Sequence, residues 1–223
     1  MKVINVAIDG PAGAGKSTIS RKAATELGFI YIDTGALYRT VGLNAMRLGV
    51  DVNDSAAVTA TLTEDLKVEL KFINGEQRMF LCGEDVSDKI RTPEASSAAS
   101  KVSAVPNVRA YLFDLQKKLA SENNCIMDGR DIGTVVLPDA DVKIFLTASP
   151  EARAKRRYLE LKEKGMDVKL EDVLSDMIKR DYDDSHRAIA PLKQADDAVL
   201  ADTSELTLEE SIDLVINIIK ERI

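Results

Sequence analysis

Several residue types are scarce in this sequence, and each shortage argues against a class of protein. The chain has no tryptophan, one histidine and two cysteines, Cys82 and Cys125, each in an apolar run and without a CxxC partner. These counts argue against a disulfide scaffold and against a zinc site of the usual spacing. We expect both thiols to be buried and reduced, and His186 to be an incidental residue of a charged segment rather than a ligand or a base.

Long hydrophobic runs and an excess of positive charge are also missing. The N-terminal apolar run is too short for a signal peptide, and no stretch approaches the ~18–20 apolar residues that span a bilayer. The formal net charge of −7 argues against general nucleic-acid binding. We therefore expect a cytoplasmic protein that binds neither membranes nor nucleic acid, with a monomer as the default state.

A glycine-rich loop near the N-terminus is the most informative stretch that is present. It fits the pattern Gly, four residues, Gly-Lys-Ser/Thr, and it lies between an apolar run at 3–8 and a helical stretch that ends near Gly28. In that context the loop amides and the helix N-terminus bind phosphates, Lys16 reaches the β- and γ-phosphates, and the Ser17 hydroxyl binds Mg²⁺. The loop residues predicted to bind ATP are Gly10, Pro11, Ala12, Gly13, Ala14, Gly15, Lys16, Ser17 and Thr18.

The remaining pattern predicts an α/β fold, because four further apolar runs of strand length alternate with helical stretches. These runs are 29–32, 125–127, 142–146 and 199–201, and with 3–8 they predict a five-stranded parallel sheet flanked by helices. Strict alternation at 66–72, the Asn74-Gly75 turn and a return strand at 79–82 predict a small antiparallel insert instead.

Helix boundaries follow from capping and breaking residues. We expect a helix over 37–48 with Arg39 in its first turn, and helical structure over 94–122 interrupted at Pro106. Ser149 and Pro150 begin a further helix, and Thr207 with Glu210 forms a capping box for the last one. We expect one domain whose parts are a core (1–36, 107–150, 190–223), a second region (37–106, with the insert at about 62–92) and a lid (about 151–189).

Charged residues at strand ends and in the lid supply the remaining chemistry. Asp128 ends a buried run, where a carboxylate can bind Mg²⁺ or its waters. Thr34 and Arg39 follow the run at 29–32, near the strand ends where ligands of such sheets bind. The lid arginines Arg153 and Arg157 share one helix face and are predicted to close over the transferred phosphoryl group.

Four segments together resemble the bacterial cytidylate (CMP/dCMP) kinase family, and the resemblance extends over essentially the whole chain. The segments are 10–18 (GPAGAGKST), 33–39 (DTGALYR), 128–136 (DGRDIGTVV) and 187–192 (RAIAPL). The first is common to many kinases, whereas DGRDIGTVV is much more specific. The resemblance implies a P-loop nucleotide kinase fold, with an insert in the nucleoside-monophosphate-binding region and a short helical lid.

The resemblance also implies a role for each matching residue. Arg39 and Arg130 would hold the phosphate of CMP or dCMP, with Thr34 standing where family members also carry serine. Ser100, Arg109 and Asp131 would contact cytosine, which suits a base with an N4 amine and acceptor atoms. Arg180 and Asp184 would approach the sugar, Arg187 the phosphates or the base, and Arg153 and Arg157 would cover ATP. Lys16, Arg130, Asp128 and Arg187 would then be catalytic, and Ser17 and Asp128 would bind Mg²⁺.

Two alternatives stay open at this point. A related P-loop kinase could act on UMP, another nucleotide or a small metabolite. A non-catalytic nucleotide-binding switch is the second, although the Asn-Lys-x-Asp tetrad that accompanies guanine recognition does not occur in the sequence.

Overall fold

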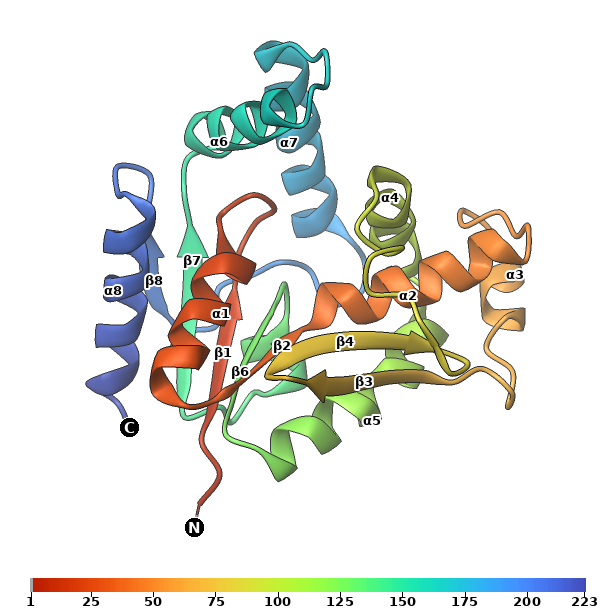
Figure 1. Cartoon of the computed structure of the whole chain (residues 1–223), viewed down its shortest axis with the longest axis horizontal. Coiled ribbons are helices and arrows are strands. Elements are labelled where there is room, and N and C mark those ends of the chain that lie inside the picture. The colour runs from red at the N-terminus through yellow and green to blue at the C-terminus, as the bar shows by residue number, and fades with distance from the viewer. Residues whose placement is uncertain (1) are drawn as a thin grey trace. The chain divides into compact units, whose positions relative to one another are not determined.

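The structure, a computed structural model, describes residues 2–223 as two compact units (Figure 1). The first unit comprises residues 1–31 and 123–223, and the second comprises residues 32–122. Strand β2 (Ile30–Asp33) passes from one to the other. The other elements of the first unit are β1 (Asn5–Asp9), α1 (Lys16–Leu27), β6 (Cys125–Gly129), η1 (Ile132–Val136), β7 (Val142–Thr147), α6 (Pro150–Glu163), α7 (Leu170–His186), β8 (Val199–Asp202) and α8 (Leu208–Lys220).

A five-stranded sheet in the order β2-β6-β1-β7-β8 confirms the predicted parallel arrangement. Strand β1 lies between β6 and β7, and the registers Ile8↔Asp128 and Asp9↔Gly129 bring the carboxyl ends of β1 and β6 side by side. In Figure 1, β1 runs into the glycine-rich loop and β7 runs in the same direction toward α6. The phosphate loop and the segment after Asp128 therefore share one edge of the sheet.

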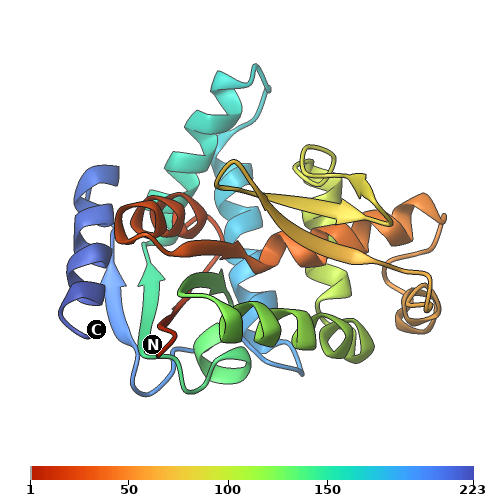
Figure 2. The same cartoon turned by 60° about the horizontal axis from the view of Figure 1, so that its bottom comes forward.

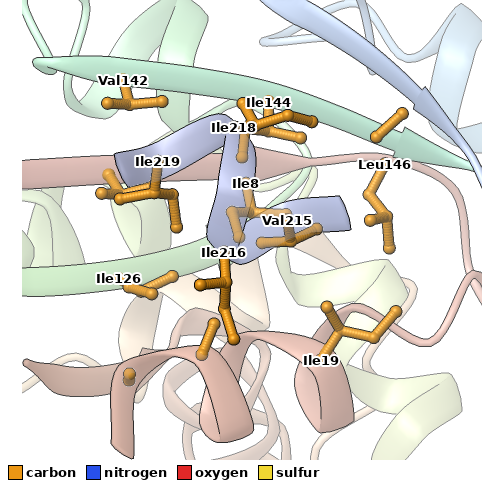
Figure 3. Close-up of a cluster of buried hydrophobic side chains, with 14 of the residues drawn as sticks. Ile8, Ile19, Ile126, Val142, Ile144, Leu146, Val215, Ile216, Ile218 and Ile219 are labelled. Carbon is orange, nitrogen blue, oxygen red and sulfur yellow. The ribbon is translucent and has the colours of Figure 1, made fainter. Parts of the chain in front are cut away.

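The buried core of the first unit explains why its strands are continuous apolar runs in the sequence. Strand residues Ile8, Ile126 and Ile144 pack with Ile19 of α1 and Val215 of α8 in one buried cluster (Figure 3). The capping box of α8 is confirmed, because Glu210 N donates to Thr207 Oγ1 at 3.2 Å and Thr207 N donates to Glu210 Oε2 at 2.8 Å. None of the helices within residues 2–223 combines the length and apolar character that crossing a bilayer demands.

The lid helices follow the predicted pattern. Ser149 Oγ accepts a hydrogen bond from Ala152 N at 3.2 Å, and Pro150 occupies the first position of α6. Gly165 follows the end of α6 with φ +74°, a conformation that glycine adopts without strain. Helices α6 and α7 then pack against each other.

The second unit contains the predicted insert and four helices that contribute to its own core. Its elements are α2 (Thr34–Arg47), α3 (Ser55–Ala60), β3 (Val68–Ile73), β4 (Glu76–Leu81), β5 (Glu84–Asp85), α4 (Pro93–Val102) and α5 (Pro106–Glu122). The break at Pro106 is confirmed, since a new helix begins there. Residues 107–122, expected with the core, lie in this unit.

Helix α2 begins earlier than predicted, and this changes the position of Arg39. Asp33 is its N-cap, with Oδ1 accepting from Ala36 N at 2.9 Å, so the helix starts at Thr34 and not at residue 37. Arg39 consequently lies in the second turn, and the expectation of the first turn was wrong. The apolar run at 29–32 indicates a strand, which does end at Asp33, but it does not indicate that Asp33 also caps the next helix.

The hairpin of the insert turns at Asn74 and Gly75, as predicted. Their φ values of 54° and 80° are the positive angles that a two-residue hairpin turn requires. The antiparallel register runs from Val68↔Leu81 to Ile73↔Glu76, so the return strand starts three residues earlier than expected. β5 completes the three-stranded sheet, and the hairpin lies along α2 (Figure 2).

Cys82 follows β4 and is exposed with φ +49°, which corrects the expectation of a buried thiol. Only Cys125 is buried, and burial raises its thiol pKa to about 12.

Candidate functional site

The glycine-rich loop joins β1 to α1 in a shape that only glycine permits at two points. A Cβ on Gly10 would lie 1.9 Å from the carbonyl oxygen of Leu146 on the neighbouring strand β7. Gly15 has φ +85° and is the N-cap of α1, and no side chain among residues 2–223 caps this helix. The first amides of α1 are therefore available to an anion, and the helix dipole favours one there.

Lys16 folds back over this loop. Its Nζ donates to the carbonyl oxygens of Gly10 and Pro11, each at 2.7 Å, and the side chain is buried. Burial lowers the pKa of Lys16, and the positive charge of Arg130 lowers it further, while Asp128 and Asp9 act in the opposite direction. The loop thus places a desolvated cation beside its own exposed amides.

Asp128 is the penultimate residue of β6, next to the loop, and its two oxygens have different partners. Ser17 Oγ donates to Oδ2 at 3.0 Å, and Tyr31 Oη donates to Oδ1 at 3.1 Å. Tyr31 was not among the predicted site residues, although it belongs to the predicted strand at 29–32. The pairing brings a hydroxyl and a carboxylate together on neighbouring elements, and hard oxygen ligands of this kind suit Mg²⁺.

A second carboxylate, Asp9, was also missed. Its oxygens accept backbone hydrogen bonds from Ile132 N at 2.8 Å and Gly133 N at 2.7 Å, at the start of η1. Burial raises the pKa of Asp9 to about 6 against the lowering effect of these two bonds. Asp9 thereby fixes the backbone that follows Arg130 and Asp131. Its place directly after an apolar run was the available signal, as it was for Asp128.

Two arginine–carboxylate pairs link the segment after β6 to the lid. Arg130 Nε donates to Asp184 Oδ2 at 2.8 Å, and Arg187 Nη2 donates to Asp131 Oδ1 at 3.3 Å. Burial alone would raise the pKa of Asp184, but the charges of Arg130, Arg180 and Arg187 outweigh it and bring this pKa below its usual value. Five of the predicted acceptor-binding residues thus lie in one charged network of the first unit.

The two lid arginines predicted to cover ATP differ sharply in this structure. Arg153 is 2% exposed, and its guanidinium donates to the carbonyls of Ala148 and Ala12, at 2.8 Å each, and to both oxygens of Asp181. It ties α6 and α7 to the phosphate loop. Arg157 is on the surface, where Nη1 donates to Glu160 Oε2 at 2.7 Å.

The second unit carries the other predicted acceptor residues on α2, α4 and α5. Arg39 Nη2 donates to Asp33 Oδ2 at 2.8 Å, and Thr34 is buried at the first position of α2. Ser100 lies in α4, half-buried. Arg109 Nη1 donates to Ser103 O at 3.4 Å, and its guanidinium carbon lies 5.9 Å from the centre of the Tyr38 ring.

An open cleft of about 430 Å³ lies beside the phosphate loop in the first unit. Its lining includes Pro11 and Arg153, together with Thr147 at the end of β7, Ser149 after that strand and Ser204 after β8. Ligands of open parallel sheets bind beyond the carboxyl ends of the strands. The cleft therefore extends the candidate site from the loop toward α6.

The chain is similar to known proteins in sequence and in fold. The sequence profile of the family described as Cytidylate kinase matches residues 6–221. The chain is 50% identical over 218 residues to the Cytidylate kinase of Caldicellulosiruptor bescii, covering 98% of this chain and 96% of the relative. It is 51% identical over 217 residues to that of Geobacter sulfurreducens, covering 97% and 93%. An uncharacterized protein from Eubacterium ventriosum superposes with a TM-score of 0.54 at 16% identity, covering 99% and 100%, which supports the fold alone.

Proposed function

The chain belongs to the cytidylate kinase family, and we propose that it is the enzyme that transfers the γ-phosphoryl group of ATP to CMP and dCMP, forming CDP and dCDP. The observation that carries this proposal is the juxtaposition of two segments on adjacent strands. The phosphate loop follows β1, and the Arg130–Asp131 pair follows β6. One segment suits the donor phosphates, and the other suits an anionic acceptor.

The donor half of the reaction rests on the phosphate loop and Lys16. The phosphates of ATP take the exposed amides at the start of α1, and the Lys16 ammonium exchanges the carbonyls of Gly10 and Pro11 for the β- and γ-phosphate oxygens. An oxygen of the CMP phosphate attacks the γ-phosphorus in line, and the bond from that phosphorus to the β–γ bridging oxygen breaks. The acceptor phosphate is already ionised at neutral pH, so the transfer needs no general base.

Mg²⁺ is part of the proposal because the donor set fits it. Ser17 and Asp128 supply two oxygen ligands in mutual hydrogen-bond contact, and Mg²⁺ in kinases usually takes one or two such protein ligands besides phosphates and waters. When bound, the ion supplies charge neutralisation and orientation of the β- and γ-phosphates.

In the first unit, the acceptor-binding roles fall to the charged network. Arg130 exchanges Asp184 for the CMP phosphate, and the guanidinium of Arg187 stabilises charge on the transferred group. Asp131 accepts a hydrogen bond from the N4 amine of cytosine. Arg180 and Asp184 bind the sugar hydroxyls. Cations that are fixed before the substrate arrives need little reorganisation during the transfer.

In the second unit, Arg39 is proposed to bind the CMP phosphate, with Thr34 as a hydroxyl partner at the start of α2. Ser100 and Arg109 are proposed to bind the base. Arg157 is partly exposed at the surface and can turn from Glu160 toward ATP. A contact between ATP and Arg153 stays a prediction, and it requires this guanidinium to exchange the Ala12 carbonyl or Asp181 for a phosphate oxygen.

A substrate panel tests the proposal. Phosphoryl transfer from MgATP is measured with CMP, dCMP, UMP and AMP at matched concentrations. We expect kcat/KM for CMP and dCMP to exceed that for UMP by at least about 10²-fold, because a site that pairs with the N4 amine leaves its carboxylate unpaired against uracil. Equal turnover of UMP or AMP would contradict the cytosine assignment. Stoichiometric ATP binding without transfer to any monophosphate would favour the nucleotide-binding switch. Cytoplasmic location, a monomeric state and the absence of a nucleic-acid partner stay predictions.

A further inference from the structure

A glutamine of the antiparallel insert makes contacts that an ordinary hairpin does not need. Gln77 lies on β4 in line with Met79 and Leu81, whose side chains are buried in the core of the second unit. An apolar residue is expected on this face. Gln77 instead directs its amide at the backbone of Asp33, the N-cap of α2, 44 positions away in the sequence.

The amide clamps both backbone groups of Asp33. Asp33 N donates to Gln77 Oε1 at 2.8 Å, and Gln77 Nε2 donates to Asp33 O at 3.4 Å. Nε2 also contacts the sulfur of Met79 at 3.5 Å, which restricts rotation of the amide. Such a two-point contact defines the position and the direction of the Asp33 backbone, since the two bonds hold the two peptide groups on either side of its Cα.

The carboxylate of Asp33 in turn holds the guanidinium of Arg39. One oxygen of its carboxylate accepts from Ala36 N at 2.9 Å and the other accepts from Arg39 Nη2 at 2.8 Å. Gly35 leaves the space for this pair, because a Cβ there would lie 3.0 Å from Arg39 Nη1 and 3.1 Å from Asp33 Oδ1. Arg39 Nε is buried without a hydrogen-bond partner within residues 2–223, so no protein acceptor other than Asp33 is seen to orient this guanidinium.

From these contacts we propose that Gln77 is a positioning residue for the acceptor phosphate, acting through Asp33 on the guanidinium of Arg39. This gives the antiparallel insert a part in substrate binding without any contact between the insert and the substrate. The inference rests on the proposed function, in which Arg39 binds the CMP phosphate. It predicts that loss of the Gln77 amide weakens CMP binding and leaves ATP binding unchanged.

The test compares Gln77→Met with a matched control on the same strand. Methionine preserves the length and the apolar contacts of Gln77 but removes both hydrogen bonds. Arg78→Met removes the neighbouring bond from Arg78 Nε to Asp85 Oδ2 at 2.9 Å and leaves the Asp33 clamp intact. CMP and ATP affinities are measured by calorimetric titration, and KM for each substrate by steady-state kinetics, on proteins whose thermal midpoints are recorded first.

We expect Gln77→Met to raise the Kd and KM for CMP by about 3–10-fold, with ATP values within about twofold of wild type, as the loss of one or two positioning hydrogen bonds predicts. Arg78→Met should leave CMP affinity unchanged. In an Arg39→Met background, the effect of Gln77→Met on CMP should disappear, because a residue that acts only through Arg39 has nothing left to position.

Three results would overturn the inference: unchanged CMP affinity in Gln77→Met, an equal loss of ATP affinity, or an effect that persists in the Arg39→Met background. Should Gln77→Met fail to fold, Gln77→Glu keeps an acceptor for Asp33 N but loses the donor, and the same criteria apply to it. A wild-type chain that does not phosphorylate CMP would refute the proposed function itself, so the two failures are distinguishable.

Discussion

The buried carboxylate of Asp9 makes the stability of this protein depend on pH in a direction opposite to that of most acidic groups. Its pKa is raised from 3.8 to about 6, chiefly by burial. The folded state therefore binds a proton more tightly than the unfolded state does. Between about pH 4 and pH 6 the folded state holds more protons, so the free energy of unfolding falls as the pH rises. At 1.36 kcal/mol per pH unit, the shift corresponds to about 3 kcal/mol across this window.

Asp9→Asn isolates this contribution. The asparagine oxygen can accept from only one of the two amides, Ile132 N or Gly133 N, and its NH₂ group then faces the other. The free energy of unfolding of the variant should therefore be about 1–3 kcal/mol lower than that of the protein with Asp9 protonated. It does not titrate. Above pH 7, where wild type has also lost about 3 kcal/mol, the two proteins should have similar stabilities, whereas near pH 4 wild type should be clearly more stable.

Urea unfolding from pH 4 to pH 8 measures this difference. Other carboxylates titrate in both proteins and cancel when the two curves are subtracted. From pH 4 to pH 7 we expect the unfolding free energy of wild type to fall by about 3 kcal/mol relative to that of Asp9→Asn. Parallel curves across the whole range would refute the reasoning, because they would mean that Asp9 ionises with an ordinary pKa in the folded protein.

Three further predictions concern other parts of the site. Gly35→Ala should keep a thermal midpoint close to that of wild type, because the preference of alanine for a helix, about 1 kcal/mol, offsets the crowding. The added Cβ should displace Arg39 and so raise the Kd for CMP several-fold. An unchanged Kd in calorimetric titration would contradict this. Arg153→Met should lower the free energy of unfolding by about 3 kcal/mol, the low end for a broken buried pair because its partner carboxylate is 25% exposed, and a loss below 1 kcal/mol in urea would count against it. Asp131→Asn should reduce the preference for CMP over UMP by at least about tenfold in kcat/KM, and an unchanged preference would remove this residue from base recognition.

Much of the fold could be predicted from the sequence because its signals are local. The buried strands are continuous apolar runs, the hairpin turn at Asn74-Gly75 needs two positive φ angles, and Thr207 with Glu210 forms its capping box within four residues. Each of these depends on residues that are neighbours in the chain. The chemistry of the phosphate loop is likewise local, because strand, glycines and helix follow one another without interruption.

The partners of polar side chains were not predictable in the same way. The guanidinium of Arg153 looks like a mobile lid group in the sequence, yet its Nη1 donates to the carbonyl of Ala12, 141 positions away. Asp9 acts on amides 123 and 124 positions further along. Asp33 is the last residue of β2, and the apolar run before it did not indicate that its carboxylate also caps α2. Such pairings depend on which strands become neighbours in the sheet, and no local sequence pattern determines that order.

The carboxylate partners of the arginines in the first unit also determine how the substrate-free protein interacts with anions. Arg130 and Arg187 are already matched with Asp184 and Asp131, so a bare inorganic anion must compete with a charge that is held in place and gains little net attraction. A nucleotide bound as proposed would differ, because its hydroxyls and its base amine would supply new hydrogen-bond donors to the carboxylates that the phosphate displaces. These counter-ions therefore disfavour simple anions at Arg130 and Arg187, and they favour a ligand that offers an anion and donors within one molecule.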